Sequence, residues 1–210
     1  EKLARFGWTY ITVDIQWYEP NATSFNYRKG AVLSMDQWGR LLPAENRFPS
    51  AAGGQGFKAL GDYIHAKGLK FGLHLMRGIP RQAVEQNLPI LGSTARATDI
   101  ADVNRVCQWN TDMFGIDMAK PGAQEYYDSV FALLASWGVD YVKVDDISRP
   151  YHDNLAEIEA VRKAIGDKVT LITNPLRDMS EHKGGLFISL TLADGTALGE
   201  AAFAGGGPVN

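Results

Sequence analysis

One unit of sequence recurs along this chain and limits the folds available to it. The unit is a helical pattern of apolar residues, then a glycine, then a short apolar strand. In the segment 57–76 the helical spacing ends at Gly68 and the strand is expected over Leu69–Met76; in the segment 123–146 the order repeats around Gly138 and Val139–Asp146. Because parallel strands need a crossover between them, the repeat predicts a parallel sheet of right-handed βα units.

Further elements fit the same pattern. A strand is expected over Thr9–Trp17, after Gly7, and a fourth helix over Asn154–Ile165. Long loops should follow the strands, from about residue 18 to 50 and from Arg77 to Gly122. Loops of that length inside a compact domain are usually functional or disordered.

The alternation fits a (β/α)₈ barrel or a doubly wound sheet. No GxGxxG or Walker sequence follows any expected strand, which counts against a nucleotide-binding doubly wound fold. We therefore favour an α/β fold of the (β/α)₈ TIM-barrel type. About four or five units fit the chain where eight are required, so an incomplete barrel is expected.

The bulk composition excludes several classes of protein. The chain has 210 residues, 45% hydrophobic and 21% charged, with a formal net charge of −3 and a single cysteine. This balance gives no broad attraction to nucleic acid or to an anionic membrane, and no apolar run is long enough to span a bilayer. With no visible signal peptide and no cysteine pair, a cytoplasmic location is the expectation. The oligomeric state is left open.

Three charges stand inside the core-like strand YVKVDD at 141–146. Alternation places Lys143 and Asp145 on one face and Val142 and Val144 on the other. In a barrel the valines suit the helix side, so the two charges point into the lumen, with Asp145 at the carboxyl-terminal rim where barrel enzymes carry their active sites. The neighbouring lysine would favour the ionised carboxylate, as a nucleophile requires. The alternative is a lumen ion pair without a catalytic role.

Other candidates lie at the ends of the other expected strands. Asp14 shares a strand face with Gln16, and His74 shares one with Gly72, although turn-capping and core roles respectively are the ordinary alternatives. Trp17 and Trp109 are core aromatics by default, but a tryptophan above a barrel can stack on a sugar ring. A metal site built from Asp14, His74 and Asp145 is disfavoured because no tight ligand spacing appears, and no cofactor is expected.

Taken together, TVDIQWYEP, GRLLPAENRFPS, YIHAKGLKFGLHLMRGIP and SWGVDYVKVDD resemble the melibiase family, glycoside hydrolase family 27. The match covers about residues 3–165 and leaves an irregular tail over 166–210, in what is expected to be one partial catalytic barrel domain. The resemblance implies a retaining exo-glycosidase acting on terminal α-D-galactosides or β-L-arabinopyranosides. It places this chain at about strands two to five of the barrel.

The same resemblance implies roles for individual residues. Asp145, in the K-x-D sequence, would be the nucleophile, while Lys143 and Asp14 would bind sugar hydroxyls. Apart from the resemblance, Trp17 and Trp109 are also predicted to be substrate-binding residues. His74 stands where α-galactosidases usually have tyrosine. The usual disulfide partner of Cys107 falls at Ile147, so Cys107 should be free.

Ile15 is the most informative departure from the family pattern. Typical α-galactosidases have two consecutive aspartates, the second of which contacts the C6 hydroxymethyl group, whereas this chain has Asp14-Ile15. A β-L-arabinopyranoside has the same ring without that group, and an isoleucine would fill the vacated space. The resemblance is therefore closest to the β-L-arabinopyranosidase-like branch.

The acid/base of the family is an aspartate on the sixth strand, in a W-R-x-x-D-D-like sequence that is not found here. That carboxyl group is expected beyond Asn210, so the isolated chain should be poorly active. Two segments, 168–173 and 186–198, both suit the fifth strand; the second resembles the family better and leaves about sixteen residues around Asp167–His182 unplaced. The alternatives are a barrel aldolase with Lys143 as Schiff-base nucleophile and a non-catalytic sugar-binding fragment.

Overall fold

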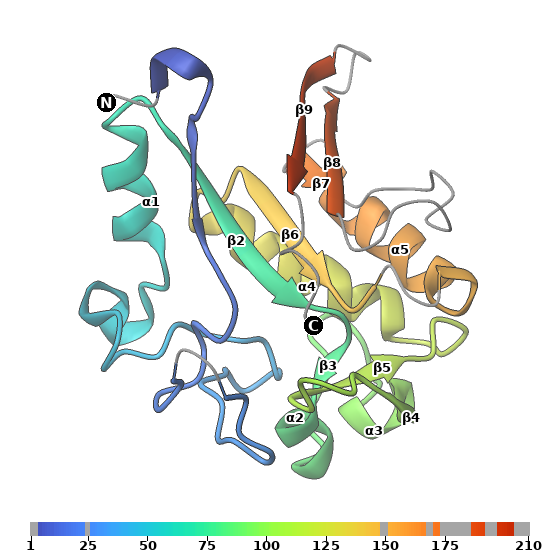
Figure 1. Cartoon of the computed structure of the whole chain (residues 1–210). Helices are drawn as coiled ribbons and strands as arrows, with labels where there is room; N and C mark the ends of the chain where they lie inside the picture. The colour runs from blue at the N-terminus through green and yellow to red at the C-terminus, as the bar shows by residue number, and fades with distance from the viewer. Residues whose placement is uncertain are drawn as a thin grey trace, which may run out of the picture.

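A four-stranded parallel sheet forms the centre of the computed structural model (Figure 1), which describes residues 4–23, 26–147, 151–166, 170–172, 186–191 and 197–203. The strands lie in the order β1 (Tyr10–Val13), β2 (Lys70–Met76), β6 (Tyr141–Asp145) and β7 (Thr170–Ile172), and every pairing is parallel. Strands that neighbour one another follow in chain order, without the order reversal of a doubly wound sheet. This is the arrangement of part of a (β/α)₈ barrel and confirms the expected fold.

Three helices connect these strands along the chain. The short 3₁₀ segments η1 (Ala4–Phe6) and η2 (Pro49–Gly54) precede α1 (Lys58–His65), which leads into β2. Helix α4 (Ala123–Ser136) leads into β6, and α5 (Tyr151–Ile165) lies between β6 and β7 and packs against α4. Gly138 follows α4 at φ 77°, the left-handed conformation that glycine adopts most readily at a helix end.

Aromatic side chains fill the core beneath the sheet on the α1 side. Trp17, Phe57, Phe71 and Trp137 are all almost completely buried and meet edge to face, with ring centroids 5.4 Å apart for Trp17 and Phe57 and 6.2 Å apart for Trp17 and Trp137. Each large buried side chain contributes about 1.5–3 kcal/mol relative to its exposed form. The loop that carries Trp17 is thereby fixed against α1 and α4.

The expected loop from Arg77 to Gly122 is a small subdomain. It holds a three-stranded antiparallel sheet in the order β3 (Ile79–Pro80), β5 (Met113–Ile116) and β4 (Ala101–Val106), with the short helices α2 (Arg81–Glu85) and α3 (Ala97–Ile100). In Figure 1 it lies at the carboxyl-terminal end of β2. The prediction of a loop was wrong because the elements are very short and β4, with the sequence ADVNRV, has no buried apolar face.

The first strand is shorter than predicted. It ends at Val13, and residues 15–18 form a turn in which Gln16 adopts φ 57°. Gln16 therefore does not share a strand face with Asp14. The aromatic and β-branched run was read as one strand, whereas its second half is a turn whose side chains enter the core.

The next strand position also differs from the preferred interpretation. Thr170–Ile172 pairs with β6, whereas β8 (Leu186–Thr191) pairs only with β9 (Ala197–Phe203) in an antiparallel hairpin, among the strands that the structure describes. The preference for 186–198 as the fifth strand was therefore wrong. Most of Asp167–His182 lies outside the described residues. Among the residues that the structure describes, no helix has the length and apolar character needed to cross a membrane.

Candidate active site

Four polar side chains converge at the carboxyl ends of the first three sheet strands. Lys143 Nζ lies 3.4 Å from Asp145 Oδ2 and 3.3 Å from Asp14 Oδ1, so the lysine joins the two carboxylates. His74 Nε2 lies 3.1 Å from the same Asp145 Oδ2. The parallel register, which pairs His74 with Lys143 and Met76 with Asp145, brings residues from two strands to one spot.

Asp145 is held as a carboxylate by these neighbours. Burial alone would raise the pKa of Asp145, but the hydrogen bond from His74, followed by the charge and hydrogen bond of Lys143, holds the pKa below its ordinary value. About a quarter of the side chain remains exposed. An ionised, partly accessible carboxylate can attack an electrophilic carbon.

His74 is fully buried, and its contacts indicate which nitrogen carries the proton. Its Nδ1 has no hydrogen-bond partner among the described residues, whereas Nε2 faces the carboxylate of Asp145. A proton on Nδ1 would be unsatisfied in the core, so the proton is assigned to Nε2, which donates to Asp145. The indole N–H of Trp17 donates to the His74 carbonyl oxygen at 2.7 Å and fixes the strand from below.

Lys143 has a different environment from a Schiff-base lysine. Its amino group is paired with two carboxylates, an arrangement that suits an ammonium ion rather than the neutral amine that attacks a carbonyl. The geometry therefore disfavours the aldolase alternative. Asp14, with 64% of its side chain exposed, leaves its carboxylate free to reach solvent or a ligand.

Two residues named from the sequence occupy places beside this cluster. Ile15 follows Asp14 directly, is half-buried, and donates its backbone N–H to Asp14 Oδ1 at 2.9 Å. Trp17 is only 1% exposed, because its ring belongs to the aromatic core. Trp17 thus supports the site from beneath. The prediction that Trp17 contacts the sugar was wrong, because the ring is buried in the core.

A second tryptophan lies at the surface with a partner that the sequence did not single out. Trp109 is 48% exposed, and its ring centroid is 5.4 Å from that of Tyr27. Burial raises the pKa of Tyr27, and the negative charges of Asp14 and Asp145 raise it further. Only the aromatic character of FNYRKG could have drawn attention to Tyr27.

The loop before the cluster is tied to the subdomain by buried hydrogen bonds. Gln16 Nε2 and the Tyr18 hydroxyl both donate to Asp112 Oδ2, at 3.0 and 3.3 Å. Burial raises the pKa of Asp112, and the bonds from Gln16 and other neighbours offset part of that rise. These contacts hold residues 14–18 against the subdomain.

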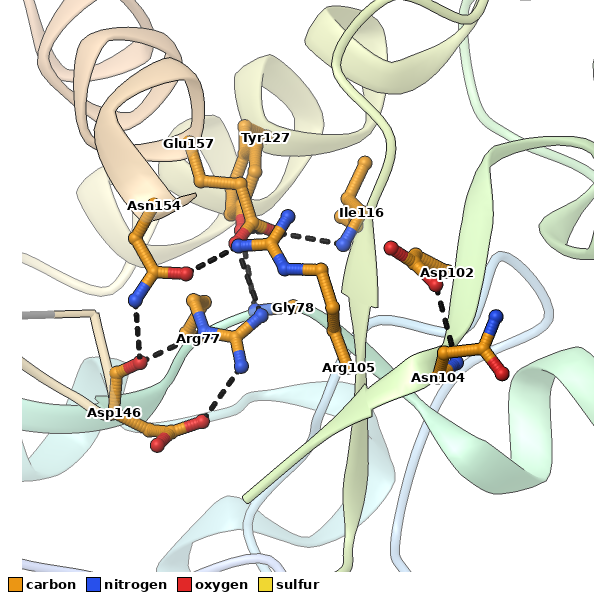
Figure 2. A network of polar contacts seen from close by, with 10 residues as sticks. All are labelled: Arg77, Gly78, Asp102, Asn104, Arg105, Ile116, Tyr127, Asp146, Asn154 and Glu157. Carbon is orange, nitrogen blue, oxygen red and sulfur yellow. Dashed lines mark hydrogen bonds and ion pairs between the residues drawn. The ribbon is translucent and has the colours of Figure 1, made fainter. Parts of the chain in front are cut away.

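Arg77 makes a further set of contacts, just beyond Asp145 (Figure 2). The guanidinium is 6% exposed; Nε donates to the Asp146 carbonyl oxygen at 2.8 Å, and NH2 lies 2.7 Å from Asp146 Oδ2. NH1 lies 3.1 Å from Oε2 of Glu157, a fully buried residue of α5. Neither Arg77 nor Glu157 was predicted from the sequence as part of the site.

Cys107 is free, as expected; it is also buried, and burial raises the pKa of its thiol. Within the part of the chain that the structure describes, no group of three or more His, Cys, Asp or Glu side chains is arranged to hold a metal ion.

No protein-family model matches this chain, but individual proteins do. It is 34% identical over 115 residues to α-galactosidase 3 of Hypocrea jecorina, which covers 55% of this chain and 16% of that protein. It is 26% identical over 170 residues to an α-galactosidase of rice (Oryza sativa subsp. japonica), covering 80% of this chain and 28% of that protein.

Solved structures give a stronger likeness. A GH27 β-L-arabinopyranosidase from Geobacillus stearothermophilus is 59% identical, with a TM-score of 0.78, over 82% of this chain and 41% of that one. A variant of that enzyme in complex with arabinose is 58% identical, also with a TM-score of 0.78, over 83% and 42%. The chain thus spans less than half the length of the proteins it matches.

Proposed function

Because this chain belongs to glycoside hydrolase family 27, on its arabinopyranosidase-like branch, we propose that the whole protein is a retaining exo-glycosidase acting on terminal β-L-arabinopyranosides. The single observation that carries the proposal is the Asp145 carboxylate, kept ionised by His74 and Lys143 at the rim of a parallel strand. Barrel enzymes place their catalytic groups at this end of the strands.

Asp145 is the nucleophile in this proposal. One of its oxygens attacks the anomeric carbon, the bond to the leaving oxygen breaks, and a glycosyl-aspartate ester forms. Water then cleaves the ester and regenerates the carboxylate. A second carboxyl group about 5–5.5 Å away must protonate the leaving oxygen and later activate the water. We assign that role to a later strand of the barrel.

The other groups bind and orient the sugar. Lys143 and Asp14 donate to and accept from ring hydroxyls, since the ammonium and the exposed carboxylate offer complementary hydrogen bonds beside Asp145. Trp109, with Tyr27 against it, supplies an exposed aromatic surface on which an apolar sugar face can stack. His74 reaches the site only through Nε2, which is committed to Asp145.

Ile15 supports the choice of sugar. Its apolar side chain beside Asp14 offers no hydrogen bond to a C6 hydroxyl and occupies space that a CH₂OH group would need. A galactoside therefore loses a polar contact and gains a steric conflict, whereas an arabinopyranoside meets neither. Residual α-galactosidase activity is expected, because the two rings are otherwise the same.

The test compares kcat/KM of the whole protein on nitrophenyl β-L-arabinopyranoside and nitrophenyl α-D-galactoside. The proposal predicts hydrolysis of both, faster with the arabinopyranoside, and loss of both in Asp145→Asn. A clear preference for the galactoside would contradict the assigned sugar. Turnover that survives Asp145→Asn would contradict the assigned nucleophile.

A further inference from the structure

We propose that Arg77 is a positioning residue that fixes the direction of the Asp145 carboxylate through the backbone of residues 145 and 146. The inference rests on the proposed function, since it takes Asp145 as the nucleophile. Arg77 stands one residue after β2, and Asp145 ends β6, so the two occupy adjacent strand ends.

Arg77 holds both residues of this segment. Its backbone N–H donates to the Asp145 carbonyl oxygen at 3.0 Å. Its side chain binds the next residue, Asp146. Nε donates to the Asp146 carbonyl oxygen at 2.8 Å, and NH2 donates to Asp146 Oδ2 at 2.7 Å. Arg77 thus anchors two consecutive carbonyl groups, that of the peptide joining Asp145 to Asp146 and that of the peptide after it.

That anchoring matters because Asp146 has an unfavourable backbone conformation. Its φ is 60°, in the left-handed region that residues other than glycine rarely adopt. Such a conformation persists where surrounding contacts over-determine it, and it is often found at catalytic sites. The orientation of the Asp145–Asp146 peptide, and with it the side chain of Asp145, follows from this turn.

Arg77 is itself held from the opposite side by Glu157 (Figure 2). Glu157 has 0% exposure; its Oε1 accepts from the Ile116 N–H at 2.6 Å and from the Tyr127 hydroxyl at 3.3 Å, and its Oε2 faces Arg77 at 3.1 Å. The Tyr127 hydroxyl also accepts from the Gly78 N–H at 3.1 Å. Helices α4 and α5 and strand β5 therefore all fix the guanidinium.

The planar guanidinium is the group that this geometry needs. Nε and NH2 face residue 146 while NH1 faces Glu157, so each nitrogen has its own acceptor. A lysine keeps the charge but presents one nitrogen and cannot reproduce the three fixed directions. Arg77→Lys therefore tests positioning with little change in net charge.

Arg105 offers a matched control. It lies 3.3 Å from the same Glu157 Oε2 and donates to the Asn154 side chain, so it belongs to the same network but approaches from β4. Arg105→Lys disturbs Glu157 without removing the contacts that Arg77 makes with residues 145 and 146.

The first experiment measures kcat, KM and Tm of both variants in the whole protein. We expect Arg77→Lys to lower kcat about 10–100-fold with KM within about threefold, because a displacement near 1 Å can cost about 10²-fold. Arg105→Lys should stay within about threefold of the parent in kcat, in line with its not touching the nucleophile segment. Arg77→Ala should also lose kcat, and added guanidinium ion should restore part of that loss. If Arg77→Lys and Arg105→Lys lose kcat equally, and in proportion to their losses of Tm, the proposal is overturned.

The second experiment does not depend on activity. Amide hydrogen exchange at residue 77 reports the bond to the Asp145 carbonyl oxygen, and this amide is retained in Arg77→Lys. Faster exchange at residue 77 in Arg77→Lys, but not in Arg105→Lys, would support the positioning role. Unchanged exchange would overturn it. If the parent protein hydrolyses no glycoside, the proposed function fails, and this measurement still decides whether Arg77 anchors the segment.

Discussion

His74 Nε2 lies 3.1 Å from Asp145 Oδ2, although 71 residues separate the two in the sequence. The contact exists because β2 and β6 are neighbours in register, and because Trp17 holds the His74 backbone from below. It leaves Asp145 with a donor on one side and the Lys143 ammonium on the other. The reactivity of the carboxylate is therefore set by two adjacent strands.

The pH dependence of catalysis should report this contact. The pKa of Asp145 is lowered. The acid limb of the kcat/KM profile that reports Asp145 is therefore expected below the ordinary aspartate pKa of about 3.9. In His74→Phe the hydrogen bond is lost while burial remains, so the limb should move to higher pH. The stabilising effect of the ionised Asp145 is likewise present above that range and lost as pH falls through the lowered pKa.

His65→Phe is the control for this shift. His65 also pairs with an aspartate, at 2.7 Å from Asp140 Oδ2, but it lies on α1 and its side chain is 38% exposed. The acid limb should be the same in His65→Phe and the parent. An acid limb that does not move in His74→Phe would show that His74 leaves the ionisation of Asp145 unchanged.

Ile15 should control which sugar is preferred. In Ile15→Asp the ratio of kcat/KM for the α-galactoside to that for the β-L-arabinopyranoside is expected to rise about 10–200-fold, since the new carboxylate can accept from a C6 hydroxyl. Ile15→Val keeps an apolar side chain and should leave the ratio within about threefold. Equal ratios in all three proteins would remove Ile15 from the specificity argument.

Gly78 should be intolerant of any side chain. It has φ +97°, and a Cβ there would lie 1.9 Å from the Phe114 carbonyl oxygen. Gly78→Ala should lower the free energy of unfolding by about 3 kcal/mol or more, from backbone strain and overpacking together.

Gly53→Ala separates these two contributions. Gly53 also has a positive φ, of +71°, but a Cβ there would meet nothing within 4 Å. Its cost should be the strain alone, about 1–2 kcal/mol. Equal losses of unfolding free energy for the two substitutions, measured by denaturant titration, would contradict the close approach at Gly78.

The parallel core could be predicted from the sequence because its signals are local. The helix, glycine and strand order around Gly68 and Gly138 fixes the βα units, and alternation places Lys143 and Asp145 on one face. The same rule failed over residues 14–17, because nothing in the local pattern announces the positive φ of Gln16. It also failed for β3 to β5, whose short strands depend on contacts with one another.

Residues whose partners are distant in the sequence could not be predicted either, because no local pattern shows those contacts. The sequence shows Glu157 only as a charged residue within a helical pattern. In the structure it is fully buried and contacts Arg77, Arg105 and the Ile116 N–H. The sequence shows Tyr27 only as an aromatic residue in a loop, whereas in the structure its ring lies against that of Trp109. Such contacts depend on the tertiary arrangement, which a single sequence does not display.

In the proposed function, Asp145 forms the covalent bond to the sugar. The most direct measurement is mass spectrometry of peptides from the whole protein after reaction with a 2-fluoro-β-L-arabinopyranosyl donor, whose C2 fluorine slows breakdown of the intermediate. We expect one added fluoroarabinosyl group on the peptide that contains Asp145, and no such adduct in Asp145→Asn. An adduct on Asp14 or Asp146, or turnover of the donor with an adduct that persists in Asp145→Asn, would contradict it.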